Sequence, residues 1–142
     1  MVKQISVFIE NKSGRLAEAT RIVGNAGVNV RALAVADTSD FGVLRFISDD
    51  TAKAVAALKE AGFTATATEV LAAEVPDRPG GLADMLELFS ENGINVEYLY
   101  AFFKKSHENA VIIIKVEDRE KTVELLNSKG IKLMSADEIG TL

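Results

Sequence analysis

Two short segments of this sequence carry groups that could bind a small carboxylate. Asn11 is followed three residues later by Gly14, and Asp77 is followed three residues later by Gly80, in each case where the pattern predicts that a helix begins. The first N–H groups of a helix have no partner within the helix, and the helix dipole adds roughly half a positive charge there. Glycine lets a ligand approach the backbone closely, so both segments predict a carboxylate site. Asn, Asp and a Pro-Gly pair are also ordinary turn residues, which is the alternative interpretation.

An asparagine recurs at a second place where its type is unexpected. Asn29 lies in the segment GVNV and Asn95 in the segment GINV, each as the second residue of a predicted strand. Asparagine is a poor strand former, so its presence in both segments needs a reason. Its amide could hydrogen-bond the ammonium or carboxylate of a ligand, or it could close a turn.

The remaining residues do not suggest catalysis. His107 is the single histidine and lies in a polar hairpin segment, and the chain contains no cysteine. The sequence has no second metal ligand at a suitable spacing, no nucleophile elbow and no phosphate-binding glycine loop. The acidic pairs at residues 49–50 and 117–118 are explained as helix caps. We therefore expect a protein that is not an enzyme and that uses no metal or other cofactor.

Charge and hydropathy limit the classes of partner. The formal net charge is −5 and the isoelectric point is near 4.9, which argues against nucleic acid and against an anionic membrane surface. Residues 1–71 carry eight basic and eight acidic side chains, whereas residues 72–142 carry eight and thirteen. The absence of cysteine, of an N-terminal apolar segment and of any long apolar run predicts a cytoplasmic protein.

The chain is an internal repeat, and this repeat decides the expected fold. A shift of 66 residues places residues 11–18 on residues 77–84 and residues 26–30 on residues 92–96. After two further residues the shift is 68, and Gly62 then coincides with Gly130. Agreement in order and spacing predicts two similar domains, residues 1–71 (copy one) and residues 72–142 (copy two).

Hydrophobic periods predict the same elements in each copy. Alternation of apolar and polar residues over 4–10 predicts a strand, and apolar residues three and four apart after Gly14 predict a helix that ends at Gly27. A strand pair at 28–37 and 42–48, a helix ending at Gly62 and a strand at 63–71 complete copy one. Copy two repeats this with strands at 71–76, 94–104, 108–117 and 131–136 and helices at 81–92 and 119–129. The predicted class is α+β, with two ferredoxin-like βαββαβ units whose antiparallel sheets carry their helices on one face.

Several predicted strands are apolar on both sides, so something should cover the sheet face that has no helices. The residues that indicate this include Phe8 and the stretches 33–36, 99–103 and 111–114. Tyr98, Tyr100 and Phe102 share one side of their strand. They are expected to pack either in the core of a two-domain arrangement or in a homodimer surface.

The segments NKSGRLAE with GVNV, and DRPGGLAD with GINV, resemble the ACT domain, a regulatory module found on amino-acid enzymes. The likeness extends through both copies, and it implies an amino-acid ligand held between two ACT units. In the family the loop before the first helix contacts this ligand, and an asparagine at the start of the second strand faces it from the neighbouring unit. Carried over by position, these residues are Asn11, Gly14, Arg15, Leu16 and Asn29 in copy one, and Asp77, Gly80, Gly81, Leu82 and Asn95 in copy two.

Three departures from the family pattern put the equality of the two sites in doubt. Copy one has Ser13 where proline is usual, and it has Arg15 where copy two has Gly81. Some members use a histidine two residues before the first loop residue, where Ile9 and Val75 stand here. We therefore expect unequal sites, or a single site that functions.

The resemblance implies a sensor that acts alone, or a regulatory subunit of an amino-acid biosynthetic enzyme such as acetohydroxyacid synthase. A regulator of transcription that acts through protein partners is a third interpretation. If two units paired through their second strands within one chain, the linking segment would have to span roughly 29 Å, although four residues reach at most about 14 Å. Pairing between chains, hence a homodimer, or an exchange of terminal strands is therefore expected.

Overall fold

The computed structural model describes residues 2–37, 40–102 and 109–141, and it divides the chain into two compact units. The first unit is Lys3–Thr68, and the second is Glu69–Leu142 together with Val2. The predicted hairpin that contains His107 lies outside the described residues. The predicted α+β class with two βαββαβ units is confirmed.

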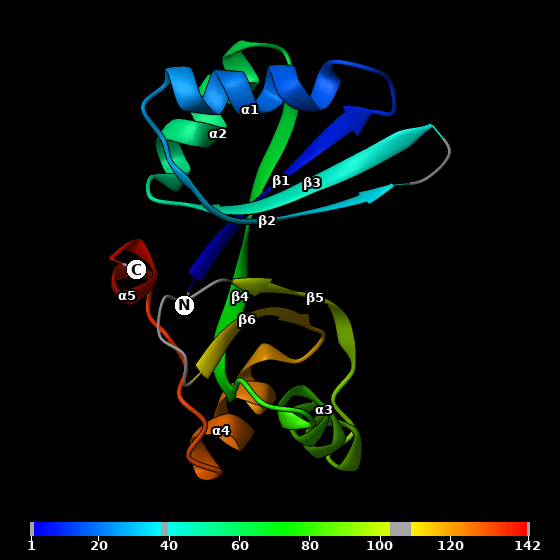
Figure 1. Ribbon diagram of the computed structural model, residues 1–142, viewed down its shortest axis with the longest axis vertical. Coiled ribbons are helices and arrows are strands. Elements are labelled where there is room, and N and C mark those ends of the chain that lie inside the picture. The colour runs from blue at the N-terminus through cyan, green and yellow to red at the C-terminus, as the bar shows by residue number, and fades with distance from the viewer. Residues whose placement is uncertain (1, 38–39, 103–108, 142) are drawn as a thin grey trace. The chain divides into compact units, whose positions relative to one another are not determined.

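The first unit packs two helices against one face of an antiparallel sheet (Figure 1). Its sheet has the order β2-β3-β1-β4, and alternate apolar residues of the strands meet the apolar sides of the helices. Asp50 caps α2 by accepting a hydrogen bond from the backbone of Lys53, as the acidic pair predicted. The elements are β1 (Val2–Glu10), α1 (Arg15–Asn25), β2 (Val30–Asp37), β3 (Phe41–Ser48), α2 (Thr51–Glu60) and β4 (Thr64–Pro76).

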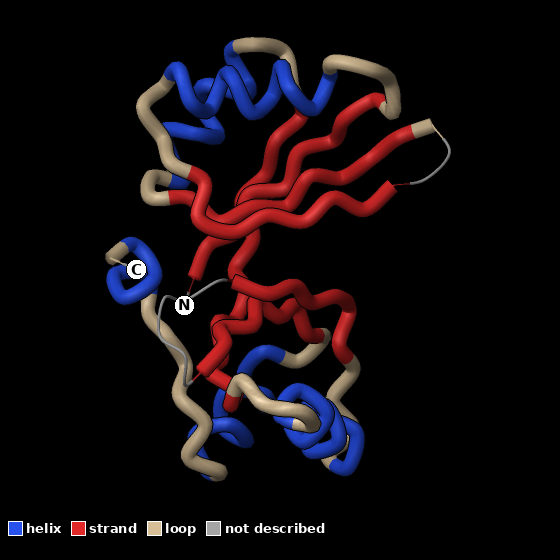
Figure 2. The backbone as a smooth tube through the Cα atoms, viewed as in Figure 1, coloured by secondary structure: helices blue, strands red, loops and turns tan. Residues whose placement is uncertain are grey.

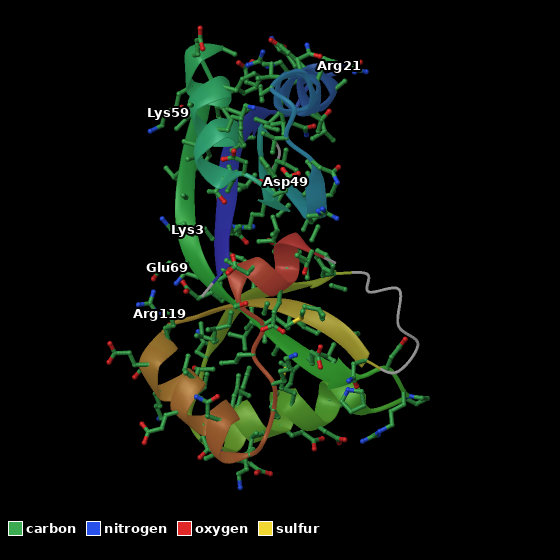
Figure 3. All side chains as sticks on the ribbon, turned by 90° about the vertical axis from the view of Figure 1, so that its left-hand side faces the viewer. Lys3, Arg21, Asp49, Lys59, Glu69 and Arg119 are labelled. Atoms are coloured by element: carbon green, nitrogen blue, oxygen red, sulfur yellow. The ribbon has the colours of Figure 1, made fainter. Side chains whose placement is uncertain are left out.

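The second unit repeats this plan around the order β4-β6-β5, again with its two longer helices on one face (Figure 1). Asp118 caps α4 through the backbone of Lys121, in the same way as Asp50 in the first unit. The side chains of Arg119 and Glu69 form an ion pair between α4 and β4, and Figure 3 shows them side by side. The further elements are α3 (Gly81–Glu91), β5 (Val96–Phe102), β6 (Asn109–Val116), α4 (Arg119–Ser128) and α5 (Ala136–Gly140).

Three predicted strands differ from the structure. The strands expected at 63–71 and 71–76 form one strand, β4, because the apolar run from Val70 to Ala73 contains no residue that would break it. The strand expected at 131–136 is reduced to a bridge between Leu133 and Ala73. It stops because Ser135 and Glu138 form a capping box that starts α5.

Side chains on the sheet faces that carry no helices are buried to different degrees in the two units. In the second unit Ile113 is fully buried, and its cross-strand partner Tyr100 is also buried. Phe102 is buried beside Val111 in the same way. In the first unit Phe8 points away from the core and is 55% exposed. The apolar character read from the sequence therefore leads to burial in one unit and to an exposed aromatic ring in the other.

Candidate functional site

The loop between β1 and α1 has a fixed backbone conformation that glycine makes possible. Gly14 immediately precedes α1 with φ of 89°, a left-handed conformation that other residues rarely adopt. The backbone N–H of Lys12 donates to the carbonyl of Glu10, and that of Arg15 donates to Lys12 at 3.3 Å. The first backbone bond of α1 runs from Glu18 to the carbonyl of Gly14, at 2.9 Å.

The loop between β4 and α3 repeats these bonds at the same shift of 66 residues. Gly80 has φ of 85°, and the N–H of Arg78 donates to the carbonyl of Pro76 at 2.9 Å. Gly81 then donates to Arg78 at 3.0 Å, and Asp84 donates to Gly80 at 2.9 Å. The two loops thus share one conformation, which the sequence repeat had predicted only as similar residue types.

Neither helix start carries a side-chain cap, and this leaves backbone donors available for a ligand. Glu18 and Asp84 use their N–H groups in the helix, whereas the preceding amides of Leu16, Ala17, Leu82 and Ala83 have no acceptor in the part of the chain that the structure describes. Each pair of neighbouring amides lies at the positive end of a helix dipole. Such a pair can hold one carboxylate through two hydrogen bonds.

The two asparagines have a structural role that accounts for part of their placement. The backbone of Asn29 donates to the Asp49 carboxylate at 2.9 Å, and its carbonyl accepts from the Asp49 N–H at 3.2 Å. In the second unit the Asn95 amide group donates to the Glu117 carboxylate at 3.1 Å. Each asparagine therefore joins the start of a strand to the acidic turn that precedes the next helix. Asn29 is exposed and its side chain has no hydrogen-bond partner among the described residues, whereas the Asn95 amide already has an acceptor.

Within one unit, the glycine loop and the asparagine are not brought together. The loop precedes α1 and Asn29 follows it, so they lie towards opposite ends of this helix. Figure 2 shows helices as blue tubes with tan loops at their two ends. Eleven helical residues span about 16 Å, which is far longer than a small amino acid. The same holds for Gly80 and Asn95 at the two ends of α3. A site that uses both features must therefore combine residues of two different units.

The copies differ most at the first helical residue. The guanidinium of Arg15 lies 4.6 Å from the centre of the Phe63 ring and forms ion pairs with Glu18 at 2.8 Å and Glu10 at 4.0 Å. Gly81 at the equivalent position is buried, and a Cβ atom there would lie 2.2 Å from the carbonyl oxygen of Pro76. The two loops thus differ in structure at this position: the first has a large side chain that is held by its neighbours, and the second has no room for a side chain.

The sequence reasoning did not include Phe63 and Glu10, which hold the Arg15 side chain in place. The repeat could have indicated them. Where copy two has Gly81 in place of Arg15, it also has Ile131 in place of Phe63 and Pro76 in place of Glu10. Asn11 and Asp77 are exposed, and the N–H of Asn11 donates to the carbonyl of Asp40.

The described residues form neither a metal-binding cluster nor a membrane-spanning helix. No group of three or more histidine, aspartate or glutamate side chains there is arranged to hold a metal ion. None of the helices described is both long enough and apolar enough to cross a membrane.

Comparisons with known proteins agree on one family. The family model of the ACT domain pair matches residues 1–142. A crystal structure of a Bacteroides thetaiotaomicron protein is similar at 38% identity, with a TM-score of 0.92, over 99% of this chain and 96% of that one. The regulatory subunit of aspartate kinase from Thermus thermophilus shares the fold at 18% identity, with a TM-score of 0.65, over 89% of this chain and 91% of that one. The same subunit from Thermus flavus shares it at 19% identity, with a TM-score of 0.62, over 89% of this chain and 90% of that one. No curated protein sequence matches.

Proposed function

Because this chain belongs to the ACT domain family as an ACT domain pair, we propose that it is a non-enzymatic regulatory protein that binds a small amino acid. The observation that carries the proposal is the pair of free backbone amides at the start of α1 and again at the start of α3. The ligand carboxylate would bind to the amides of Leu16 and Ala17, or of Leu82 and Ala83. The loops from Asn11 and Asp77 would then surround its α-carbon, with glycine at 14 and 80 allowing close approach.

The size of the helix effect shows that the amides alone are insufficient. A carboxylate at a helix start gains about 0.3 to 1 kcal/mol when exposed and up to about 2 kcal/mol when partly buried. A micromolar dissociation constant requires about 8 kcal/mol. The ammonium group must therefore find an oxygen acceptor, and the side chain must be enclosed. The Asn29 amide oxygen, from a neighbouring unit, is the acceptor we propose for this role.

A second copy of the chain is our proposed source of that neighbouring unit. Leu33 and Val35 lie on β2, and their exposed fractions are 55% and 49%. In the part of the chain described, β2 is an edge strand of its sheet. An apolar end strand offers both unpaired backbone groups and apolar area to another chain. A homodimer formed through β2 would bring the Asn29 of one chain towards a glycine loop of its partner.

The alternative is a regulatory subunit that docks on an amino-acid biosynthetic enzyme, for example acetohydroxyacid synthase. Two of the similar structures are regulatory subunits of aspartate kinase, which is a precedent for this arrangement on the same fold. The two functions differ in what the native protein carries. A docked subunit should copurify with one enzyme in stoichiometric amount, and a sensor that acts alone should purify without it.

The test of ligand binding is isothermal titration with the twenty amino acids, followed by proline substitution in the first helical turns. Leu16→Pro removes an amide that makes no bond within α1, and Leu16→Ala is the control that keeps the amide and shortens the side chain. Leu82→Pro and Leu82→Ala form the same pair in the second unit. Because a hydrogen bond to a charged group contributes about 1.5 to 3 kcal/mol, proline should weaken binding by at least about tenfold relative to alanine. No heat with any amino acid at millimolar concentration, or equal binding by proline and alanine variants at both loops, would refute the proposal.

A further inference from the structure

A groove runs along α3 in the second unit; it includes Gly81 of the predicted amino-acid contacts, whereas Leu82 and Asn95 do not line it. Its volume is about 360 Å³, which falls in the range of small-molecule sites. One wall is the side of α3 from Gly81 to Glu91, and the others are the end of β4 and the segment that contains Lys129 and Ile131. Val75 and Met85, both buried, lie at its apolar base.

The first unit shows what occupies the equivalent place there. The repeat aligns Gly81 with Arg15 and Ile131 with Phe63. In the first unit the Arg15 side chain lies across the Phe63 ring and is held by carboxylates, with 26% of its surface exposed. This part of the first unit is therefore filled by a guanidinium group on an aliphatic stem. The second unit has neither the arginine nor the aromatic ring, and the residues at both positions, Gly81 and Ile131, line the groove.

The second unit cannot supply that cation from position 81. A Cβ atom on Gly81 would lie 2.2 Å from the Pro76 oxygen and 3.2 Å from the Pro76 carbonyl carbon. Both neighbours are backbone atoms, which cannot turn aside as a flexible side chain can. The backbone of Pro76 therefore excludes a side chain at position 81, and this keeps the groove open.

The side chains along this side of the helix differ in charge between the two copies. Glu87 and Glu91 line the groove, whereas the equivalent residues in the first unit are Arg21, which Figure 3 shows on α1, and Asn25. Neither Glu87 nor Glu91 has an ion-pair partner in the part of the chain that is described.

Two further carboxylates of the groove are partly compensated. Asp84 forms an ion pair with Arg78 at 3.0 Å, and Glu74 accepts a hydrogen bond from the Asn109 amide at 3.5 Å. Lys129 is the one cationic side chain among the groove residues. Because Asp84 is paired with Arg78, the acidic residues of the groove that have no ion-pair partner among the described residues are Glu87 and Glu91, and these can accept a cation.

We propose that the α3 groove is a second ligand site, which binds a small organic cation with a guanidinium or primary ammonium group on a short aliphatic stem. The stem packs on Met85 and Ile131, as the Arg15 stem occupies the equivalent place in the first unit. The cationic group pairs with Glu87 and Glu91. This site shares Gly81 with the predicted amino-acid contacts but differs from them in chemistry, because its ligand needs no carboxylate and uses no helix amide.

The test uses agmatine, which has a guanidinium at one end, an ammonium at the other and no carboxylate. Amide NMR spectra of the full chain are recorded during titration with agmatine at low salt. We expect saturable shifts along α3 and at Ile131, which Glu87→Gln with Glu91→Gln weakens by about three- to tenfold. Glu120→Gln with Glu124→Gln, on the exposed side of α4, is the matched control and should leave the binding curve unchanged.

Three outcomes separate the possibilities. Saturable shifts that the Glu87 and Glu91 substitutions weaken, and that Leu16→Pro does not change, support the groove site whether or not the amino-acid site exists. The absence of saturable shifts at millimolar agmatine overturns it. Shifts that both double variants weaken equally overturn it as well, since they would report a general attraction to an acidic protein.

Discussion

Gly81 offers a sharp test of the local physics, because an alanine there should destabilise the second unit. The added Cβ would lie 2.2 Å from the Pro76 oxygen, and real Cβ atoms essentially never approach closer than 3.0 Å. The loop backbone must therefore move, and overpacking of this kind costs about 1 to 3 kcal/mol. Alanine is favoured over glycine in helices by up to about 1 kcal/mol, which offsets part of this. The expected net loss is about 1 to 2 kcal/mol.

Gly24 is the matched control within the same chain. It lies in α1, and a Cβ atom there would meet nothing within 4 Å. Gly24→Ala should therefore raise the free energy of unfolding by about 0.4 to 1 kcal/mol, because it reduces the freedom of the unfolded chain. The same chemical change thus has opposite predicted signs at two helix positions.

Urea unfolding with a probe for the second unit measures the effect of Gly81→Ala. The two tyrosines of the chain, Tyr98 and Tyr100, both lie on β5, so the near-ultraviolet tyrosine signal reports the second unit. With a slope of about 2 kcal/mol per molar urea, Gly81→Ala should lower the tyrosine midpoint by roughly 0.5 to 1 M. A midpoint equal to or above that of the unmodified protein would refute the steric reasoning, and with it the claim that the path of the chain keeps the α3 groove open.

Three further predictions concern other parts of the molecule. Arg15→Ala should destabilise the first unit by about 0.5 to 1 kcal/mol through loss of the contact with Phe63, measured by far-ultraviolet circular dichroism in urea, and a change below a few tenths would contradict it. Leu33→Lys should shift the protein towards monomer in sedimentation velocity, whereas Leu82→Lys on α3 should leave the oligomer unchanged. The hydrogen bond from Lys132 holds the pKa of Glu138 below its usual range, so the stability that this carboxylate adds to α5 is present at neutral pH and is lost as the pH falls through the lowered pKa. Glu138→Gln should remove this acid-dependent step from hydrogen exchange in α5, and an unchanged pH profile would contradict it.

The sequence predicted the fold well because the repeat gave each element two independent readings. Alternation and helical spacing located α1 to α4 and most strands to within one or two residues, and the acidic pairs were confirmed as helix caps, whereas α5 was not predicted. No loop or turn marks the predicted domain boundary between residues 71 and 72, since the strand β4 continues through it. A strand of small and β-branched residues carries no local signal that tells where one unit ends and the next begins.

The site residues were predicted less completely, for a physical reason. Gly14 and Gly80 were predicted from their place before a helix, and the structure adds that both have a left-handed backbone. Their role in ligand binding stays a prediction, as does that of Asn29 and Asn95. The contacts of these asparagines with Asp49 and Glu117 were not predicted from the local sequence pattern. Contacts between residues twenty or more positions apart depend on how the strands pair, which periodicity alone does not specify.

The sequence by itself determined the repeat, the order of the elements and the glycines that allow two helices to begin with free amides. Only the tertiary structure decided that Arg15 lies on Phe63 while its counterpart Gly81 faces a backbone oxygen. Residue type and spacing act locally, along one helix or strand. Whether a place in the fold is filled or hollow depends on side chains from three separate elements, and those meet only when the chain has folded.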